Sequence, residues 1–279
     1  MTPESFSFLA QLVKERSGLI LSNDKTYLLE SRLLPVARTD GLETIDDLVG
    51  KLKAPTSEAL REQVTEAMTT NESFFFRDKR PFEAFSEIIL PHLLETRPKK
   101  FRIWCAAAST GQEPYSLSML LKEEPAKLQG WNHEIVGTDL SAEVLRKAKL
   151  GQYTQFEVQR GLPIQLLVKY FKQVGQEWEI ASEIRSMVNY RKLNLLEDFS
   201  SLGKFDVVYC RNVLIYFDQE AKKEILERIA KQMSPDGFLV LGAAETVIGI
   251  TEAFKPLQGQ RGLYVPAGHA QSSSGAAVA

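Results

Sequence analysis

The chain has 279 residues, a formal net charge of −2 and a pI of about 6.1. This length suits one large domain, or one domain with a smaller companion. The near-neutral charge provides no broad basic surface, so we exclude a general nucleic-acid binder. Any partner must therefore be recognised by a local site.

Cys105 and Cys210 are the only cysteines, and each lies near the end of an apolar, strand-like run. This sparse use of cysteine indicates reduced thiols in a cytoplasmic protein. The N-terminal residues show no cleavage signal, and no apolar run reaches membrane-spanning length, so we expect a cytoplasmic protein without membrane insertion. The three histidines are scattered and lack cysteine neighbours at ligand spacing, so we expect no metal.

Apolar residues recur at helical spacing from the N-terminus, with interruptions at Gly18 and Gly41. Thr44 is suited to cap a third helix, and a fourth follows Ser57. We therefore predict a helical N-terminal domain over residues 1–68. Its second helix carries three basic residues that we interpret as solvated surface, with a face for an acidic partner as the alternative: Lys25, Arg32 and Arg38.

Residues 69–80 join this domain to the rest of the chain. Three consecutive phenylalanines at 74–76 fit neither the helical nor the strand period, and Asn71, Ser73 and Arg77 surround them. Core packing would explain the phenylalanines but not their polar neighbours. We therefore predict a linker that packs into a cleft between domains and contributes to the active site.

The stretch FRIWCAAASTGQEPYSLSMLL at 101–121 is typical of a buried strand, a turn of small residues and a helix start. Such a unit presents backbone N–H groups to a nucleotide ligand. Gly111 is the only glycine of the turn, which is poor for a dinucleotide pyrophosphate. Glu113 would repel a phosphate but suits an ammonium or sulfonium. The pattern favours S-adenosylmethionine over NAD, with an ordinary turn that binds no ligand as the alternative.

A second strand ends at Asp139, where an acidic residue normally accepts hydrogen bonds from ribose hydroxyls. Ser141 is better placed to cap the following helix, so we assign Asp139 to a ligand. Residues 151–187 then interrupt the alternation of strands and helices. Their EWEIASEI segment alternates like a short exposed strand, so we predict an inserted antiparallel β-subdomain that could serve as a docking platform.

The remaining strands and a closing hairpin are expected at 188–196, 205–210, 238–241 and 254–265. We interpret residues 234–237 as a turn. Together these elements predict an α/β fold with a doubly wound, Rossmann-like sheet in a domain at 81–266. Residues 267–279 are mostly glycine, alanine and serine and should be disordered.

With these elements placed, the chain resembles chemotaxis receptor methyltransferases of the CheR type over nearly its whole length. Four motifs support the resemblance: TTNESFFFRD at 69–78, WCAAASTGQEPYSL at 104–117, GTDLS at 137–141 and CRNVLIYFD at 210–218. The resemblance implies an S-adenosylmethionine-dependent enzyme that methylates glutamate side chains of chemoreceptors. Its products would be a glutamyl methyl ester and S-adenosylhomocysteine.

The resemblance also implies the site residues. Cofactor contacts would come from Asn71, Ser73, Arg77, Glu113, Asp139, Asn194, Leu195, Cys210 and Arg211. Glu113 would meet the methionine ammonium, Asp139 the ribose, and Asn194 with Leu195 the adenine. The catalytic group would be Arg77, Asn212 and Tyr216, with the last two facing the methyl group. Gln112 replaces a second glutamate of some relatives, which leaves Glu113 as the carboxylate, and Ser73 replaces a threonine.

A substrate glutamate is ionised near neutral pH, so methyl transfer needs alignment rather than a general base. We assign Arg77 and Tyr216 to steering this carboxylate, with a role of Arg77 on the cofactor as the alternative. The expected partner is a chemoreceptor cytoplasmic domain, with a receptor C-terminal peptide at the β-subdomain as a further candidate, and the expected state is a monomer. Three alternatives remain open: a methyltransferase for another substrate, a non-catalytic signalling module that binds cofactor or receptor, and, least favoured, an NAD-dependent oxidoreductase.

Overall fold

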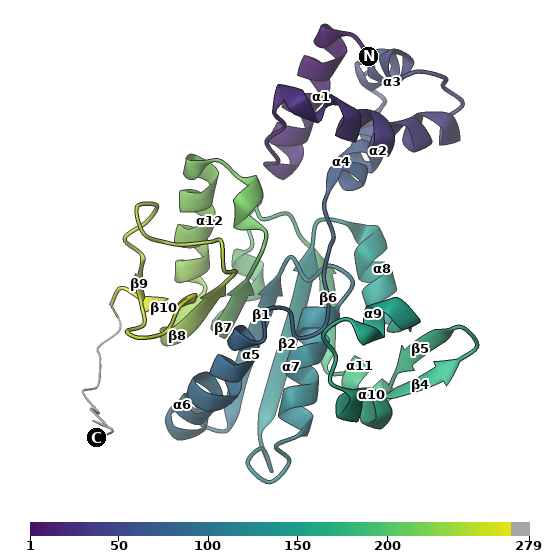
Figure 1. Ribbon diagram of the computed structural model, residues 1–279. Coiled ribbons are helices and arrows are strands. Elements are labelled where there is room, and N and C mark those ends of the chain that lie inside the picture. Colours follow the sequence, from purple (N-terminus) through teal and green to yellow (C-terminus); the bar gives the residue numbers. More distant parts are fainter. Residues whose placement is uncertain (269–279) are drawn as a thin grey trace.

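The computed structural model describes residues 1–268, which form a small helical part, a central sheet covered by helices and a short second sheet (Figure 1). The helical part lies above the sheet in Figure 1 and has a core of its own. Its α-helices are α1 (Pro3–Ser17), α2 (Thr26–Thr39), α3 (Ile45–Leu52) and α4 (Glu58–Met68). No helix within residues 1–268 is both long and apolar enough to cross a membrane. Of the tail predicted to be disordered at 267–279, Ala267 is held by a hydrogen bond from its backbone N–H to the backbone oxygen of Ala253 at 2.9 Å, and residues from 269 onwards lie outside the described residues.

Local sequence signals set the ends of these helices. Gly18 closes α1 in a left-handed conformation with a φ of 73°. Thr44 and Asp47 form a reciprocal capping box at the start of α3. We interpreted Arg32 as a solvated surface residue, but its guanidinium donates to the carbonyl oxygen of Met68 at 2.7 Å. This basic side chain therefore holds the end of α4, where the linker begins.

Within the described residues, seven strands form the central sheet in the order β6-β2-β1-β7-β8-β10-β9. The first five of these are parallel, and β10 and β9 add an antiparallel edge. The strands are β1 (Lys100–Ala106), β2 (Asn132–Asp139), β6 (Val188–Lys192), β7 (Phe205–Cys210), β8 (Met233–Leu241), β9 (Phe254–Pro256) and β10 (Leu263–Pro266). This order confirms the predicted doubly wound fold and its closing hairpin.

Alternate side chains of the strands enter two apolar cores, one on each face of the sheet. Ile103 and Cys105 of β1 belong to one core, and Trp104 and Ala106 belong to the other. The helices α5 (Arg80–Ala84), α6 (Leu90–Thr96), α7 (Gln112–Lys122) and α8 (Ala142–Leu150) pack on the first face, with a π-helical turn (Phe85–Ile89) between α5 and α6. Helix α12 (Gln219–Lys231) packs on the second.

Two boundaries differ from the sequence expectation. Residues 234–237, interpreted as a turn, belong to β8, which continues through an irregular pairing with β7. The strand predicted at 188–196 ends at Lys192. Asn194 and Leu195 therefore lie on the loop that follows the strand, at the carboxyl end of the sheet.

The insert contains the predicted antiparallel sheet, to the right of the main sheet in Figure 1. Its elements are β3 (Gln152–Thr154), α9 (Gln155–Gln159), α10 (Ile164–Tyr170), β4 (Phe171–Val174), β5 (Glu177–Ile180) and α11 (Ser182–Arg185), with the strands in the order β3-β5-β4. Phe75 of the linker packs edge-on against Tyr153 and Phe171 of the insert, with ring centroids 5.0 and 5.5 Å apart. The linker and the insert therefore share one apolar core.

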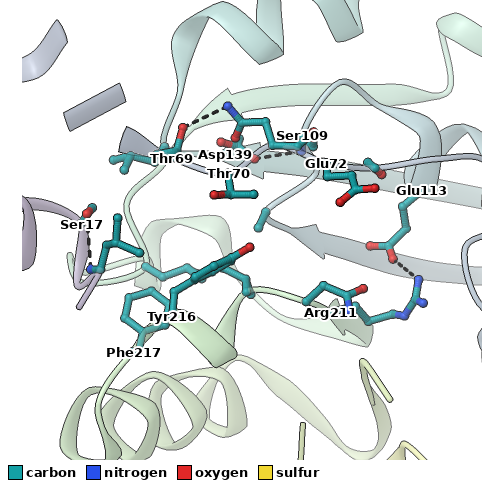
Figure 2. Close-up of a pocket in the computed structure, with 18 of the residues that line it drawn as sticks. Ser17, Thr69, Thr70, Glu72, Ser109, Glu113, Asp139, Arg211, Tyr216 and Phe217 are labelled. Carbon is teal, nitrogen blue, oxygen red and sulfur yellow. Dashed lines mark hydrogen bonds and ion pairs between the residues drawn. The ribbon is translucent and has the colours of Figure 1, made fainter. Parts of the chain in front are cut away.

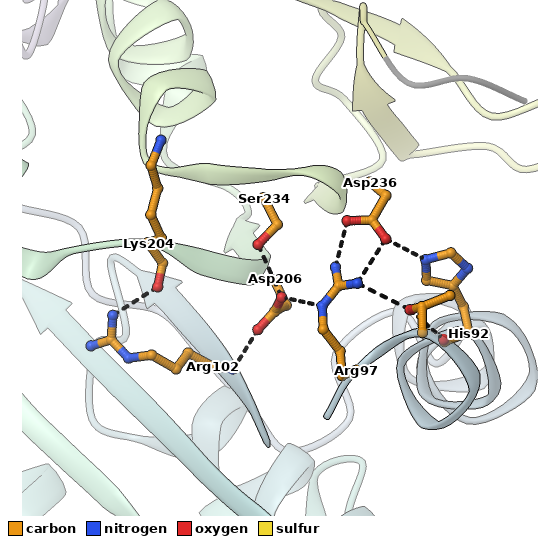
Figure 3. A network of polar contacts seen from close by, with 8 residues as sticks. His92, Arg97, Arg102, Lys204, Asp206, Ser234 and Asp236 are labelled. Atoms are coloured by element: carbon orange, nitrogen blue, oxygen red, sulfur yellow. Dashed lines mark hydrogen bonds and ion pairs between the residues drawn. The ribbon is translucent and has the colours of Figure 1, made fainter. Parts of the chain in front are cut away.

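A polar network ties together the amino-terminal ends of the strands (Figure 3). Arg97 donates to both carboxylate oxygens of Asp236, at 2.6 and 2.7 Å, and to Asp206 at 2.6 Å. The other oxygen of Asp206 accepts the backbone N–H of Arg102 at 2.8 Å. Hydrogen bonds from Arg97 lower the pKa of Asp236 to about 2. The network fixes one end of β1, β7 and β8 and leaves the opposite end for a ligand.

Candidate active site

A cavity opens at the carboxyl ends of β1, β2 and β7, beneath the helical part (Figure 2). The chain moves outward from β1 to β2 and β6, and then returns to β7 and β8 on the other side of β1. Ligands of doubly wound sheets bind at this reversal. The register places Ala106 of β1 beside Thr138 of β2 and Cys210 of β7. The turns that follow these three strands therefore lie next to one another.

Unusual backbone conformations gather around this cavity. Ala107, Ser109 and Asn212 have positive φ angles of 62°, 51° and 58°, which side-chain-bearing residues rarely adopt. Gly111 is the N-cap of α7 with a φ of 95°, and a Cβ there would lie 2.6 Å from the hydroxyl oxygen of Tyr190. Gly111 is thus required by packing as well as by conformation. Strained residues of this kind cluster where a protein positions a ligand.

Asp139 lies at the end of β2 and faces the cavity. One carboxylate oxygen accepts the backbone N–H of Ser109 at 2.9 Å, and the other accepts that of Ser141 at 3.0 Å. Burial raises the pKa of Asp139, and these backbone hydrogen bonds oppose the rise. Ser141 caps α8, so the helix does not need Asp139 as its cap. The carboxylate oxygens of Asp139 have further lone pairs that can accept hydrogen bonds from ligand hydroxyls.

Glu113 and Arg211 form a buried ion pair at one end of the cavity, with Oε2 and Nη1 2.7 Å apart (Figure 2). Burial raises the pKa of Glu113, and the charge of Arg211 opposes the rise. Arg211 also donates to Asp78 and to the backbone oxygen of Arg77, at 2.7 and 2.8 Å. Its Nε atom has no hydrogen-bond partner among the described residues. Both signs of charge therefore meet at this end of the cavity.

Residues of the linker line the cavity beside this pair. The hydroxyl of Ser109 donates to the backbone oxygen of Asn71 at 2.7 Å, which joins the linker to the turn after β1. The guanidinium of Arg77 donates to the backbone oxygen of Glu72 at 2.8 Å and lies 5.5 Å from the ring centre of Phe74. Arg77 thus rests on the linker itself, at the edge of the cavity.

Asn212 and Tyr216 follow β7, and the Tyr216 side chain points towards the middle of the cavity (Figure 2). A carboxylate that sequence reasoning missed, Glu245, accepts the backbone N–H of Asn212 at 2.7 Å. One signal was present in the sequence, because Glu245 is an acidic residue shortly after the carboxyl end of a parallel strand. The position of Asn212 therefore depends on the turn that follows the neighbouring strand β8.

The helical part closes the other end of the cavity, where Ser17 and Leu19 join the lining (Figure 2). Asn194 donates from its side-chain amide to the backbone oxygen of Arg16 at 2.7 Å. The backbone N–H of Ile20 donates to the backbone oxygen of Tyr216 at 3.2 Å. Sequence reasoning identified the end of α1 but gave no signal that it contacts the sheet. These contacts bring residues more than 170 positions apart into one wall.

The structure brings together ten of the eleven site residues that the sequence suggested: Asn71, Ser73, Arg77, Glu113, Asp139, Asn194, Leu195, Arg211, Asn212 and Tyr216. Cys210 is the exception. Its side chain is fully buried in the core beneath β7 and is not part of the cavity lining. The roles of the ten remain predictions, while their convergence is a finding.

The chemistry of the lining suits S-adenosylmethionine. Glu113 and Arg211 offer both charges to a zwitterionic amino-acid group. Asp139 offers acceptors to ribose hydroxyls. At the other end, Leu19 and Leu195 provide apolar surface for a purine ring.

Comparisons with known proteins agree with this chemistry. The family model described as the CheR methyltransferase SAM-binding domain matches residues 71–263, and the CheR all-alpha domain matches residues 4–69. Chemotaxis protein methyltransferase Cher2 of Pseudomonas putida is 40% identical, covering 90% of this chain and 93% of that protein. Chemotaxis protein methyltransferase 1 of Pseudomonas aeruginosa is also 40% identical, with coverages of 92% and 96%. That of Vibrio cholerae is 34% identical, with coverages of 94% and 96%. The chain therefore belongs to the CheR methyltransferase family and is an S-adenosylmethionine-dependent methyltransferase.

Proposed function

We propose that this enzyme transfers a methyl group from S-adenosylmethionine to glutamate side chains of chemoreceptors, as part of chemotaxis. The products are a glutamyl methyl ester and S-adenosylhomocysteine. The relatives named above support the chemotaxis role. The observation that carries the proposal is that Asp139, the Glu113–Arg211 pair and Tyr216 face one cavity.

The protein's contribution is binding and alignment. When bound, S-adenosylmethionine supplies a methyl group activated by its sulfonium. A substrate glutamate is already ionised near neutral pH, so no side chain needs to remove a proton. Good alignment of reacting groups contributes roughly 7 to 11 kcal/mol in favourable cases. We assign this alignment to Asn212 and Tyr216, which leave β7 towards the cavity, and to Arg77 at its edge.

Arg77 has two candidate roles. It can steer the incoming substrate carboxylate, or it can hold the amino-acid end of the cofactor. A cation directly on the reacting oxygen would lower the nucleophilicity of that oxygen, which favours contact with the other carboxylate oxygen or with the cofactor. Its side chain is partly buried and bonds only to linker backbone among the hydrogen bonds of the described residues, so it is free to turn towards either target.

We propose a second binding surface for the receptor on the insert. Strand β4 is an edge of the three-stranded sheet, and Lys172, Gln173 and Val174 on it are exposed. An exposed edge strand can pair with an extended peptide through backbone hydrogen bonds. This feature supports binding of a receptor C-terminal peptide at β4. We further propose a cytoplasmic monomer that meets its receptor through this edge and through the cavity.

A transfer assay tests the function. The protein is incubated with methyl-labelled S-adenosylmethionine and a receptor cytoplasmic fragment, and mild base is then added. We expect transferred label that base releases as methanol, since a carboxylate ester is hydrolysed while N-methyl groups are not. The control is a receptor fragment whose methylatable glutamates are changed to alanine. Base-stable label would indicate another acceptor, and cofactor binding without any transfer would indicate a non-catalytic module.

A further inference from the structure

The turns that leave β7 and β8 lie side by side. The register pairs Cys210 with Leu241, so the chain continues into Asn212 on one strand and Gly242 on the other. Glu245 completes the short turn after β8, and its backbone N–H donates to the oxygen of Gly242 at 3.0 Å. Only 8% of Glu245 is exposed. Its side chain therefore points back into the protein, towards the turn after β7.

Glu245 binds four backbone N–H groups. Oε1 accepts from Val213 at 2.9 Å and from Leu214 at 2.7 Å, while Oε2 accepts from Asn212 and from Gly242, both at 2.7 Å. A carboxylate has about four acceptor directions, so this set uses all of them. Three of the donors are consecutive, and such a run forms a concave anion-binding nest. The anion in this nest is the protein's own side chain.

The surrounding residues are adapted to this contact. A Cβ at position 242 would lie 2.6 Å from Glu245 Oε2 and 3.0 Å from the backbone nitrogen of Asn212, so only glycine leaves the contact intact. Asn212 itself has a φ of 58°, which persists only where other contacts fix the backbone. Glu245 supplies these contacts, because it bonds to Asn212 and to the two residues after it.

We propose that Glu245 is a positioning residue for methyl transfer. By fixing the 212–214 backbone, it sets where Asn212 and Tyr216 stand relative to the substrate side of the cavity. Glu245 itself is not part of the cavity lining and acts through these two residues. The proposal rests on the function proposed above, since it takes Asn212 and Tyr216 to face the reacting groups.

The first test is Glu245→Gln. A glutamine amide nitrogen cannot accept hydrogen bonds, so two of the four N–H groups lose their partner. We expect kcat to fall by about 10- to 100-fold, as for a displacement near 1 Å at a reaction centre. The affinity for S-adenosylhomocysteine should stay unchanged. Glu252→Gln, an exposed position on the same segment, is the matched control and should keep full kcat. Equal kcat in both variants would overturn the proposal.

A variant cycle separates positioning from simple stabilisation, and hydrogen exchange tests the contact itself. In a background of Asn212→Ala with Tyr216→Phe, Glu245→Gln should cost little additional kcat, because its effect passes through those residues. A full additive loss would contradict this. In wild-type protein without cofactor, the amides of 212–214 should exchange slowly with deuterium, and fast exchange would overturn the proposal even if the variant fails to fold. A wild-type enzyme that transfers no methyl to receptor would refute the proposed function rather than this contact.

Discussion

Gly18 and Phe217 touch across the boundary between the helical part and the sheet. A Cβ at Gly18 would lie 2.3 Å from the Phe217 ring, and that ring is buried in the wall of the cavity. The glycine that ends α1 therefore has two functions. Its φ of 73° turns the chain, and its missing side chain leaves room for Phe217.

Gly18→Ala should weaken cofactor binding through this contact. The left-handed conformation alone costs an alanine about 1 to 2 kcal/mol. Gly41→Ala is a matched control, because Gly41 has a φ of 76° and a Cβ added there would meet no atom within 4 Å. We expect both variants to lose thermal stability, Gly18→Ala the more because of its clash with Phe217, while only Gly18→Ala loses affinity for S-adenosylhomocysteine in calorimetry. Equal affinities would show that the end of α1 does not shape the site.

Glu113→Gln should reduce the affinity for S-adenosylhomocysteine by about 10- to 100-fold, the range expected for a hydrogen bond to a charged group. The neutral amide removes the anion that would meet the ligand ammonium and leaves Arg211 with less compensation. Calorimetry gives the affinity, and Glu220→Gln on the exposed start of α12 is the control. Unchanged affinity in Glu113→Gln would remove Glu113 from the ligand site.

The affinity should also fall at low pH. Burial raises the pKa values of Glu113 and Asp139, and a ligand that needs both groups ionised must overcome their protonation. The affinity for S-adenosylhomocysteine should therefore weaken as the pH falls through the pKa values of Glu113 and Asp139, which lie above those of ordinary carboxyl groups. Titrations of wild type, Glu113→Gln and Asp139→Asn across mildly acidic pH check this. Each variant should lose part of the slope, and an identical slope in all three would exclude both groups.

Arg77→Ala distinguishes the two roles of this residue. If Arg77 steers the substrate, methyl transfer should be lost while most of the S-adenosylhomocysteine affinity survives. If it holds the cofactor, both should fall together. Arg160→Ala is a useful control, since Arg160 lies over the same Phe74 ring, 4.3 Å from its centre, but outside the cavity lining. Full transfer by Arg77→Ala would contradict both roles.

Arg97→Ala should destabilise the fold by about 3 kcal/mol or more, because it leaves the largely buried Asp206 without its cationic partner. Arg146→Ala breaks an exposed, solvent-screened pair and should leave the free energy of unfolding nearly unchanged. Denaturant unfolding measures both. Arg97 and its neighbours lower the pKa of Asp236 from 3.8 to about 2. The stabilisation of the fold by this ion pair is therefore present above pH 3.8 and is lost as the pH falls towards 2. Arg97→Ala should flatten that acid-side loss.

Much of the fold and site could be predicted because it rests on local patterns. The buried strand ending in small residues, the acid after β2 and the cap at Thr44 each carry their signal within a few residues. The notable misses are long-range. Three hydrogen bonds join residues far apart in sequence. Arg211 donates to Glu113, Arg32 donates to the backbone oxygen of Met68 at the end of α4, and Glu245 accepts the backbone N–H of Asn212. A single sequence can mark one member of such a pair, as the position of Glu245 after a parallel strand does, but it does not indicate the partner.

Two further differences from the sequence expectation also depend on the surrounding sheet. Residues 234–237 have the composition of a turn, yet pairing with β7 keeps them in β8. Cys210 belongs to a motif whose neighbours line the cavity, but the alternation of side chains along β7 turns it into the core. In the first case the neighbouring strand decides the outcome, and in the second the position of the residue along its own strand does.

A calorimetric titration of the intact protein with S-adenosylhomocysteine, with NAD as the competing ligand, shows whether this cavity is a site for S-adenosylmethionine. We predict one S-adenosylhomocysteine site per chain, weakened by Glu113→Gln and by Asp139→Asn, and no binding of NAD. Folded wild-type protein that binds no S-adenosylhomocysteine, or that binds NAD in its place, would refute this assignment of the cavity.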